Sequence, residues 1–182
     1  VTGVQTCALP ICLHAWNLLV FWMVFMEIAI LYVGGPMVLG RKMPIPSVAK
    51  SGWFLMAGAA VVVNVAIWTT DPPLEQQPLL TSYVPLRSSP LFYAGAALFL
   101  LGATVAALPF FATLWKEKRE NPGKSLPLIT FGAFATSIIA FESLVGGLAT
   151  YVPTFLWSVD ILPSIDAEWY RQMYWTIGHG SQ

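Results

Sequence analysis

Long apolar stretches separated by short polar segments dominate the pattern of residues along this chain. Complete stretches run over residues 13–39, 52–69, 91–114 and 128–151, and a further one begins near residue 167 and continues to residue 182. A helix needs about 20 mainly apolar residues to cross the hydrocarbon core of a bilayer, and the four complete stretches meet or approach that length. No segment alternates with a period of two, which argues against a transmembrane β-barrel. The pattern therefore predicts an all-α, polytopic transmembrane helical bundle with four complete spans and the start of a fifth.

Composition supports a membrane protein and excludes other classes. Of the 182 residues, 57% are hydrophobic and 10% are charged, whereas a soluble domain carries roughly 25% charged residues. The formal net charge is zero, so no nucleic-acid partner is expected. The two cysteines, Cys7 and Cys12, give neither a metal-ligand spacing nor a disulfide framework.

The first residues differ from the rest of the chain. Residues 1–11 show no periodicity and no capping residues, and they read like an in-frame translation of a sequencing adapter. A short signal peptide is the alternative, but this segment has no basic region and no apolar core of its own. We therefore expect native sequence over residues 12–182, and Cys7 is left out of the fold.

The loops predict how the spans are oriented. Seven of the nine basic residues fall in two alternate loops, residues 40–51 and 115–127. The other two loops are mainly acidic. Cytoplasmic loops are enriched in Lys and Arg, so loops 40–51 and 115–127 are expected on the cytoplasmic side. The first span then runs inward, with His14 at its outer end and His179 in the outer half or near the middle of the membrane.

Four ionisable residues within or beside the spans are candidates for chemistry, because such groups are costly in a membrane and often functional. His179 follows an aromatic run, and imidazole is a common metal ligand; a histidine hydrogen-bonded between helices fits equally. His14 fits either a ligand or a residue of the headgroup region, and its neighbours fit an aromatic belt or a cofactor pocket. Glu142 fits a proton path or a paired carboxylate, and Glu27 is better explained by pairing.

Other polar and small residues have structural interpretations. Asn64 and Thr136 are candidates for hydrogen bonds between helices, and the glycine pair at residues 146–147 suits close helix packing. The Gly-Gly-Pro sequence at residues 34–36 is expected to end or kink the first span.

Two segments resemble a known family. Residues 14–16 (His-Ala-Trp) through 34–41 (Gly-Gly-Pro-Met-Val-Leu-Gly-Arg) resemble the second transmembrane helix of heme-copper oxidase subunit I. Residues 174–179 (Tyr-Trp-Thr-Ile-Gly-His) are similar to its sixth helix. The resemblance covers residues 13–182 and implies a fragment of a larger bundle, with helices two to six.

The resemblance also implies roles. His14 matches the axial ligand of the low-spin heme, and His179 matches a copper ligand of the binuclear centre. The implied cofactors are a low-spin heme, a high-spin heme and copper, and the chain has no Cys-x-x-Cys-His motif for covalent heme attachment. Glu142 has no role in the resemblance and stays a candidate for a proton path.

The implied activity is that of a respiratory terminal oxidase in the inner (plasma) membrane of a prokaryote, which reduces oxygen to water with proton uptake. Its partners would be membrane lipid, other oxidase subunits and an electron donor such as cytochrome c, a cupredoxin or a quinol. Gly180 follows His179 where many oxidases have proline, so a nitric oxide reductase of the same superfamily is an alternative. A third is a transporter or structural membrane subunit without a cofactor.

Overall fold

The computed structural model describes residues 12–69, 84–86 and 88–178, and all regular elements in these ranges are helical. In chain order they are η1 (Ala15–Trp22), α2 (Met23–Tyr32), η2 (Val33–Met37), α3 (Pro46–Thr69), α4 (Pro90–Glu120), α5 (Leu128–Ser158) and α6 (Ala167–Gly178). Four continuous helices are long and apolar enough to cross a membrane: Cys12–Met37, Pro46–Thr69, Pro90–Glu120 and Leu128–Ser158. The predicted all-α bundle of four spans is therefore confirmed.

The helices differ in length from the apolar stretches. We expected the third span over residues 91–114, but α4 continues to Glu120, and α5 continues past the expected end at residue 151 to Ser158. The extra turn of α4 is charged, and such residues can continue a helix into water beyond the hydrocarbon. The extra turns of α5 run past Pro153 and are mainly apolar. Likewise, α3 begins at Pro46, a residue type favoured in the first turn.

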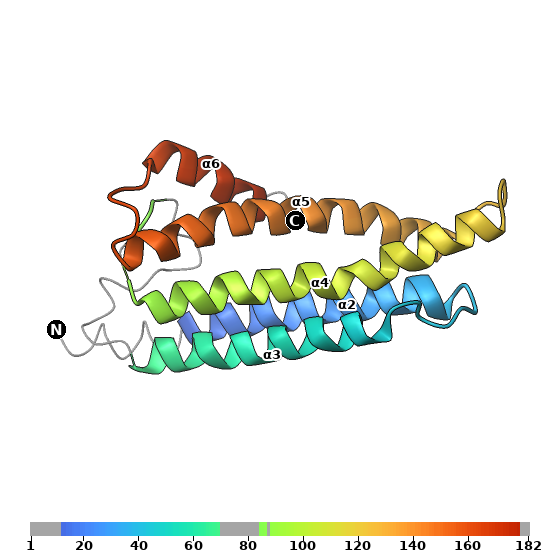
Figure 1. Ribbon diagram of the computed structural model, residues 1–182, viewed down its shortest axis with the longest axis horizontal. Coiled ribbons are helices and arrows are strands. Elements are labelled where there is room, and N and C mark those ends of the chain that lie inside the picture. Colours follow the sequence, from blue (N-terminus) through green and yellow to red (C-terminus); the bar gives the residue numbers. More distant parts are fainter. Residues whose placement is uncertain (1–11, 70–83, 87, 179–182) are drawn as a thin grey trace.

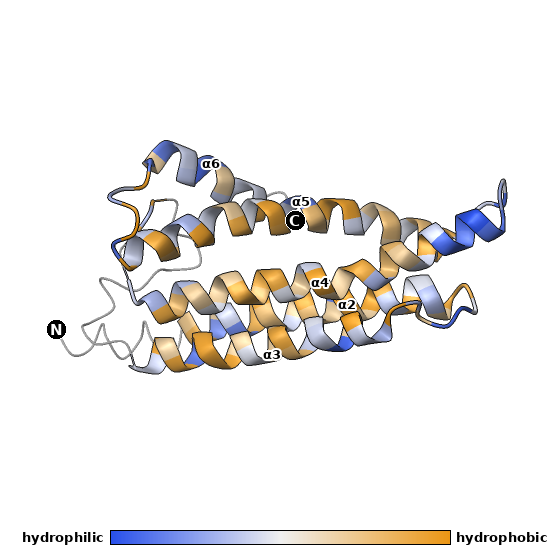
Figure 2. Ribbon diagram, in the orientation of Figure 1, coloured by the Kyte–Doolittle hydropathy of each residue, from blue (hydrophilic) through white to orange (hydrophobic). Residues whose placement is uncertain are grey.

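The four long helices lie side by side along the longest axis of the molecule (Figure 1). Helix α4 packs against α3 on one side and α5 on the other, and α6 packs against α5. Figure 2 shows hydrophobic residues along most of these helices, with hydrophilic residues gathered at the far end of α4 and at the start of α6. The polar ends therefore lie at opposite ends of the bundle.

Glycines let α3 and α4 approach closely. A methyl group at Gly52 would lie 2.6 Å from the backbone nitrogen of Ala106, and one at Gly102 would lie 2.8 Å from the backbone nitrogen of Met56. Both distances are too short for real atoms, so a side chain at either position would push the helices apart. Lipid is as apolar as the helices, so close van der Waals contact is a main source of their association.

Amide and hydroxyl groups add hydrogen bonds between helices. The side-chain amides of Asn17 and Asn64 donate to each other's oxygen at 2.7 and 3.1 Å, and the Tyr32 hydroxyl donates to the carbonyl of Ala106 at 2.7 Å. The expected interhelical bond of Asn64 is confirmed. Thr136 is exposed and has no interhelical hydrogen bond within the described part of the chain.

The Gly-Gly-Pro sequence forms η2, a π-helical turn that ends the first span. Gly34, Gly35 and Pro36 are all buried. A methyl group at Gly34 would lie 2.8 Å from Cβ of Ala133 on α5, and one at Gly35 would lie 2.7 Å from the ring of Phe110 on α4. The first span therefore ends wedged between α4 and α5, which agrees with the expected end or kink at this point.

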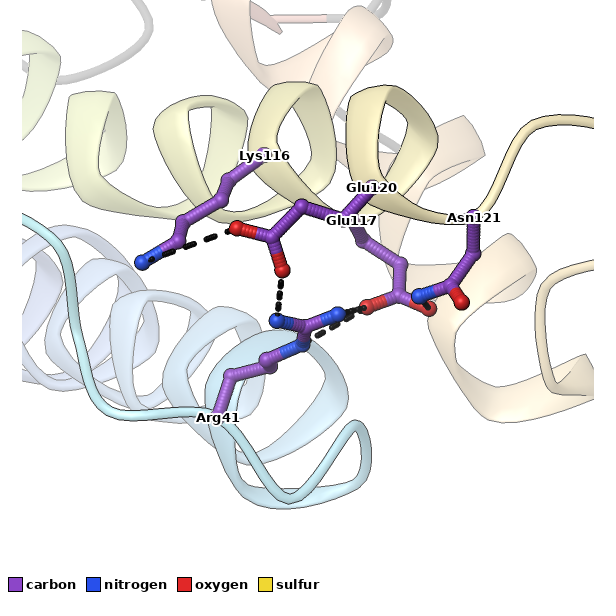
Figure 3. A network of polar contacts seen from close by, with 5 residues as sticks. All are labelled: Arg41, Lys116, Glu117, Glu120 and Asn121. Atoms are coloured by element: carbon purple, nitrogen blue, oxygen red, sulfur yellow. Dashed lines mark hydrogen bonds and ion pairs between the residues drawn. The ribbon is translucent and has the colours of Figure 1, made fainter.

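An ion-pair network joins the two basic loops (Figure 3). Arg41 lies 2.6 Å from Glu117 and also pairs with Glu120, while Asn121 donates to the second oxygen of Glu117 at 2.9 Å. The hydrogen bonds to Glu120 and Glu117 raise the pKa of the Arg41 guanidinium. Loops 40–51 and 115–127 therefore lie at one end of the bundle, opposite His14.

The contact between α3 and α4 can be tested with two glycines on one helix. We expect Gly52→Ala to destabilise the complete subunit by ~1–3 kcal/mol, the usual cost of overpacking a tight interface. A lower thermal midpoint in detergent would show this. Gly58 is exposed, and a methyl group there meets nothing within 4 Å, so Gly58→Ala should leave the midpoint unchanged or raise it. Equal midpoints for both variants would contradict the close packing.

Candidate functional site

His14 lies directly before η1, at the end of the first span that is opposite the basic loops. Its backbone is helical, with φ −61° and ψ −49°, and its side chain makes no capping hydrogen bond. The side chain is exposed, as are those of Leu18 and Trp22, four and eight residues further along. His14 thus heads an apolar strip of the first span that no other described helix covers.

Trp16 points to the other side of the same helix and is 3% exposed. Its ring lies 5.1 Å from Phe92 on α4, 6.1 Å from Tyr151 on α5 and 5.7 Å from Phe21, measured between centroids. Trp16 and Phe21 therefore pack in the core between three spans. This differs from both expectations for the neighbours of His14, an aromatic belt and the wall of a cofactor pocket. Trp22, by contrast, is 58% exposed.

The π-helical geometry of η1 explains how Trp16 and Phe21 share a face. In a π-helix the hydrogen bonds join residues five apart, so residues five apart point in more similar directions than they would in an α-helix. In an α-helix the same two residues would point in clearly different directions. The π-helix is eight residues long. Such segments are rare in proteins, and those that occur are often found at functional sites.

Helix α6 is held against α5 by small residues and hydrogen bonds. The Asp166 side chain caps its start by accepting from the backbone N–H of Trp169 at 2.6 Å. The Ser143 hydroxyl donates to the carbonyl of Thr176 at 3.2 Å. A methyl group at Gly146 would overlap the side chain of Thr176, and one at Gly147 would lie 3.2 Å from Ile177. The expected packing role of the glycine pair is confirmed.

His179 lies outside the described residues, because the described part of α6 ends at Gly178. The last described turns of α6 lie beside Ser143 and Gly147, near the midpoint of α5. The last described turn of α6 therefore lies beside the middle of α5 rather than beside one of its ends.

The two carboxylates of the apolar stretches, Glu27 and Glu142, both lie within the described part of the chain. Glu142 is exposed and precedes Ser143, the residue that contacts α6. Glu27 is half-buried in α2 and has no ion pair within the described part of the chain, so its expected pairing is not seen there. No group of three or more His, Cys, Asp or Glu side chains suited to a metal ion occurs among the described residues.

A cluster of four tyrosines was not anticipated from the sequence. Tyr93 on α4, Tyr151 on α5, and Tyr170 and Tyr174 on α6 are all buried. The rings of Tyr170 and Tyr174 stack at 5.9 Å, those of Tyr93 and Tyr151 lie 6.4 Å apart, and Tyr151 shares a hydrogen bond with Tyr174. The four-residue spacing of the two α6 tyrosines is a signal that could have indicated a buried face.

The surroundings of His14 fit a heme ligand. No hydrogen bond of its imidazole is found within the described part of the chain, and imidazole is a standard axial ligand of heme iron. The exposed side chains of Leu18 and Trp22 extend the same face and suit the apolar plane of a porphyrin. A low-spin heme iron takes two axial ligands, so a second axial ligand would have to come from another part of the protein.

Comparisons with known proteins show which family the chain belongs to. The family model of "Cytochrome C and Quinol oxidase polypeptide I" matches residues 10–181. Cytochrome c oxidase subunit 1 of Thermus thermophilus is 33% identical over 107 residues, which make up 58% of this chain and 19% of that protein. The match therefore spans about a fifth of the relative's length. No solved structure gives a significant match.

Proposed function

Because the chain belongs to the cytochrome c and quinol oxidase polypeptide I family, we propose that it is part of the catalytic subunit of a respiratory terminal oxidase that reduces oxygen to water. The observation that carries the proposal is the position of His14. It lies at the end of the first span opposite the basic loops, exposed on an apolar face and without a hydrogen bond among the described residues.

In this proposal His14 is an axial ligand of a low-spin heme. Its helical backbone fixes the direction of the imidazole, because η1 is anchored on its other side by Trp16, which is buried among rings of α4 and α5. Leu18 and Trp22 would exclude water from the bound porphyrin. Burial and axial ligation set the potential of a heme, so these residues would tune it.

His179 is proposed as one ligand of the copper in the binuclear centre. Ser143, Gly146 and Gly147 hold the preceding turn of α6 against the middle of α5, which supports a position at depth in the membrane. Heme and copper, when bound, would supply the electron transfer and the reduction of oxygen. Glu142 stays a candidate for a proton path, because a mid-span carboxylate is costly unless it is used.

The setting of the enzyme is also proposed. The subunit would lie in the inner membrane of a prokaryote, assembled with other oxidase subunits and supplied with electrons by cytochrome c, a cupredoxin or a quinol. The name of the Thermus thermophilus relative supports oxygen over nitric oxide as the substrate.

Replacing the two histidines separately tests their roles. In the complete subunit we expect His14→Ala to abolish the absorption and spin-resonance signals of the low-spin heme while copper is retained. His179→Asn should do the reverse, with copper lost on metal analysis and the low-spin heme signals kept. Because each variant is expected to keep the metal centre that the other loses, a variant that loses both centres would be misfolded. An unchanged low-spin spectrum in His14→Ala would refute its role as the ligand.

The same metal analysis tests the substrate. An oxidase would contain copper in the binuclear centre, whereas a nitric oxide reductase would contain nonheme iron in its place. Copper in the complete unmodified enzyme, together with oxygen uptake, is the expected result. Nonheme iron without copper would favour the reductase, and a colourless, metal-free protein would contradict both.

The proposed orientation can be measured with single cysteines. We expect a membrane-impermeant thiol reagent to label Lys42→Cys and Ser125→Cys only from the cytoplasmic side, because both residues lie in the basic loops. Ser164→Cys, in the connection between α5 and α6, should be labelled only from the outside. All three residues are exposed, so labelling of either loop from the opposite side would overturn the orientation.

A further inference from the structure

An open groove of about 560 Å³ lies where the last turns of α4 meet the start of α5. Its lining is almost wholly apolar and comes from Phe111, Leu114, Trp115, Leu126 and Phe134, together with the side chains of Lys118 and Arg119, which line it mainly with their carbon stems. The volume falls within the range of sites for small molecules, about 300–1,000 Å³. The groove lies at the end of the bundle that carries the basic loops.

The lining changes from apolar to cationic along the helix axis. Phe111, Trp115 and Lys118 follow one another at four- and three-residue spacing, which places them on one face of α4, and Arg119 lies one turn beyond Trp115. The apolar residues therefore lie deeper in the membrane and the two cations lie nearer the water. Trp115 is 75% exposed between them, at the level where tryptophans collect in membrane proteins.

The positive charge of this groove is not neutralised by the acidic residues nearby. Glu117 and Glu120 face Arg41 and pair with it (Figure 3). The Lys118 ammonium donates to the carbonyl of Lys124 at 2.6 Å and has three donors in all, so two remain. Arg119 makes no ion pair within the described part of the chain.

We propose that this groove binds an anionic phospholipid. Its phosphate would contact Lys118 and Arg119, and its acyl chains would lie along Phe111, Leu114 and Phe134. Basic pockets between transmembrane helices at the cytoplasmic side, where the proposed orientation puts this groove, bind the headgroups of anionic lipids. A lipid fits better than a polypeptide segment, because the lining changes from apolar to cationic along the membrane normal, as a phospholipid does. The proposal uses no residue assigned to heme or copper.

Lipid titration of the complete subunit tests this. The purified protein in detergent is titrated with phosphatidylglycerol, and bound lipid is counted by native mass spectrometry. We expect the double variant Lys118→Gln/Arg119→Gln to bind phosphatidylglycerol about 30-fold more weakly, from the usual contribution of two cations near the headgroups. Lys42→Gln/Lys50→Gln removes the same charge from the other basic loop, and it should bind like the unmodified protein.

A second variant separates the groove from the charge. Leu126→Trp should fill the apolar part while Lys118 and Arg119 stay, and binding of phosphatidylglycerol should again be lost. Equal binding by the double variant and its control would refute the site. The proposal would also be overturned if a photoreactive residue at position 115 cross-linked another polypeptide of the oxidase and no lipid. Heme and copper contents should be unchanged in all variants, which keeps this test distinct from that of the proposed function.

Discussion

Close approach of helix backbones is the constraint on which this structure depends. Within hydrocarbon, apolar side chains gain nothing from leaving lipid for protein, so helices must associate through van der Waals contact and hydrogen bonds. Gly52 and Gly102 bring α3 and α4 together, Gly34 and Gly35 let the first span end between α4 and α5, and Gly146 seats α6 on α5. Each of these contacts would open if its glycine carried a side chain.

Polar interactions specify positions along these contacts. In the span region, Asn17 and Asn64 satisfy each other, which is favourable because an unpaired amide in hydrocarbon is costly. Beyond the hydrocarbon, Arg41 joins two loops through Glu117 and Glu120. Such an ion pair near water contributes little stability by itself, but it fixes which ends of the helices lie together. Among the described residues Glu117 and Glu120 pair with Arg41 and do not pair with Lys118 or Arg119.

The candidate heme ligand depends on the packing behind it. Trp16 is buried on one side of η1 while His14 is exposed on the other, so the core that holds Trp16 also directs the imidazole. The tyrosine cluster holds α6 in a similar way, through side chains that are buried on one side of the helix. Tyr170 and Tyr174 bury one side of that helix, and this burial positions its last described turn.

The sequence alone determined the class of fold, the number of spans and the grouping of basic loops, because apolar length and loop charge are local properties. It also indicated His14 through the resemblance, and Asn64 and the pair at residues 146–147 through residue type. Only the tertiary structure decided that Trp16 and Phe21 lie in the core, that η1 is π-helical, that Glu142 is exposed and that four tyrosines meet. These features depend on which helix faces which, and hydropathy carries no record of that, since lipid-facing and helix-facing residues in a membrane are equally apolar.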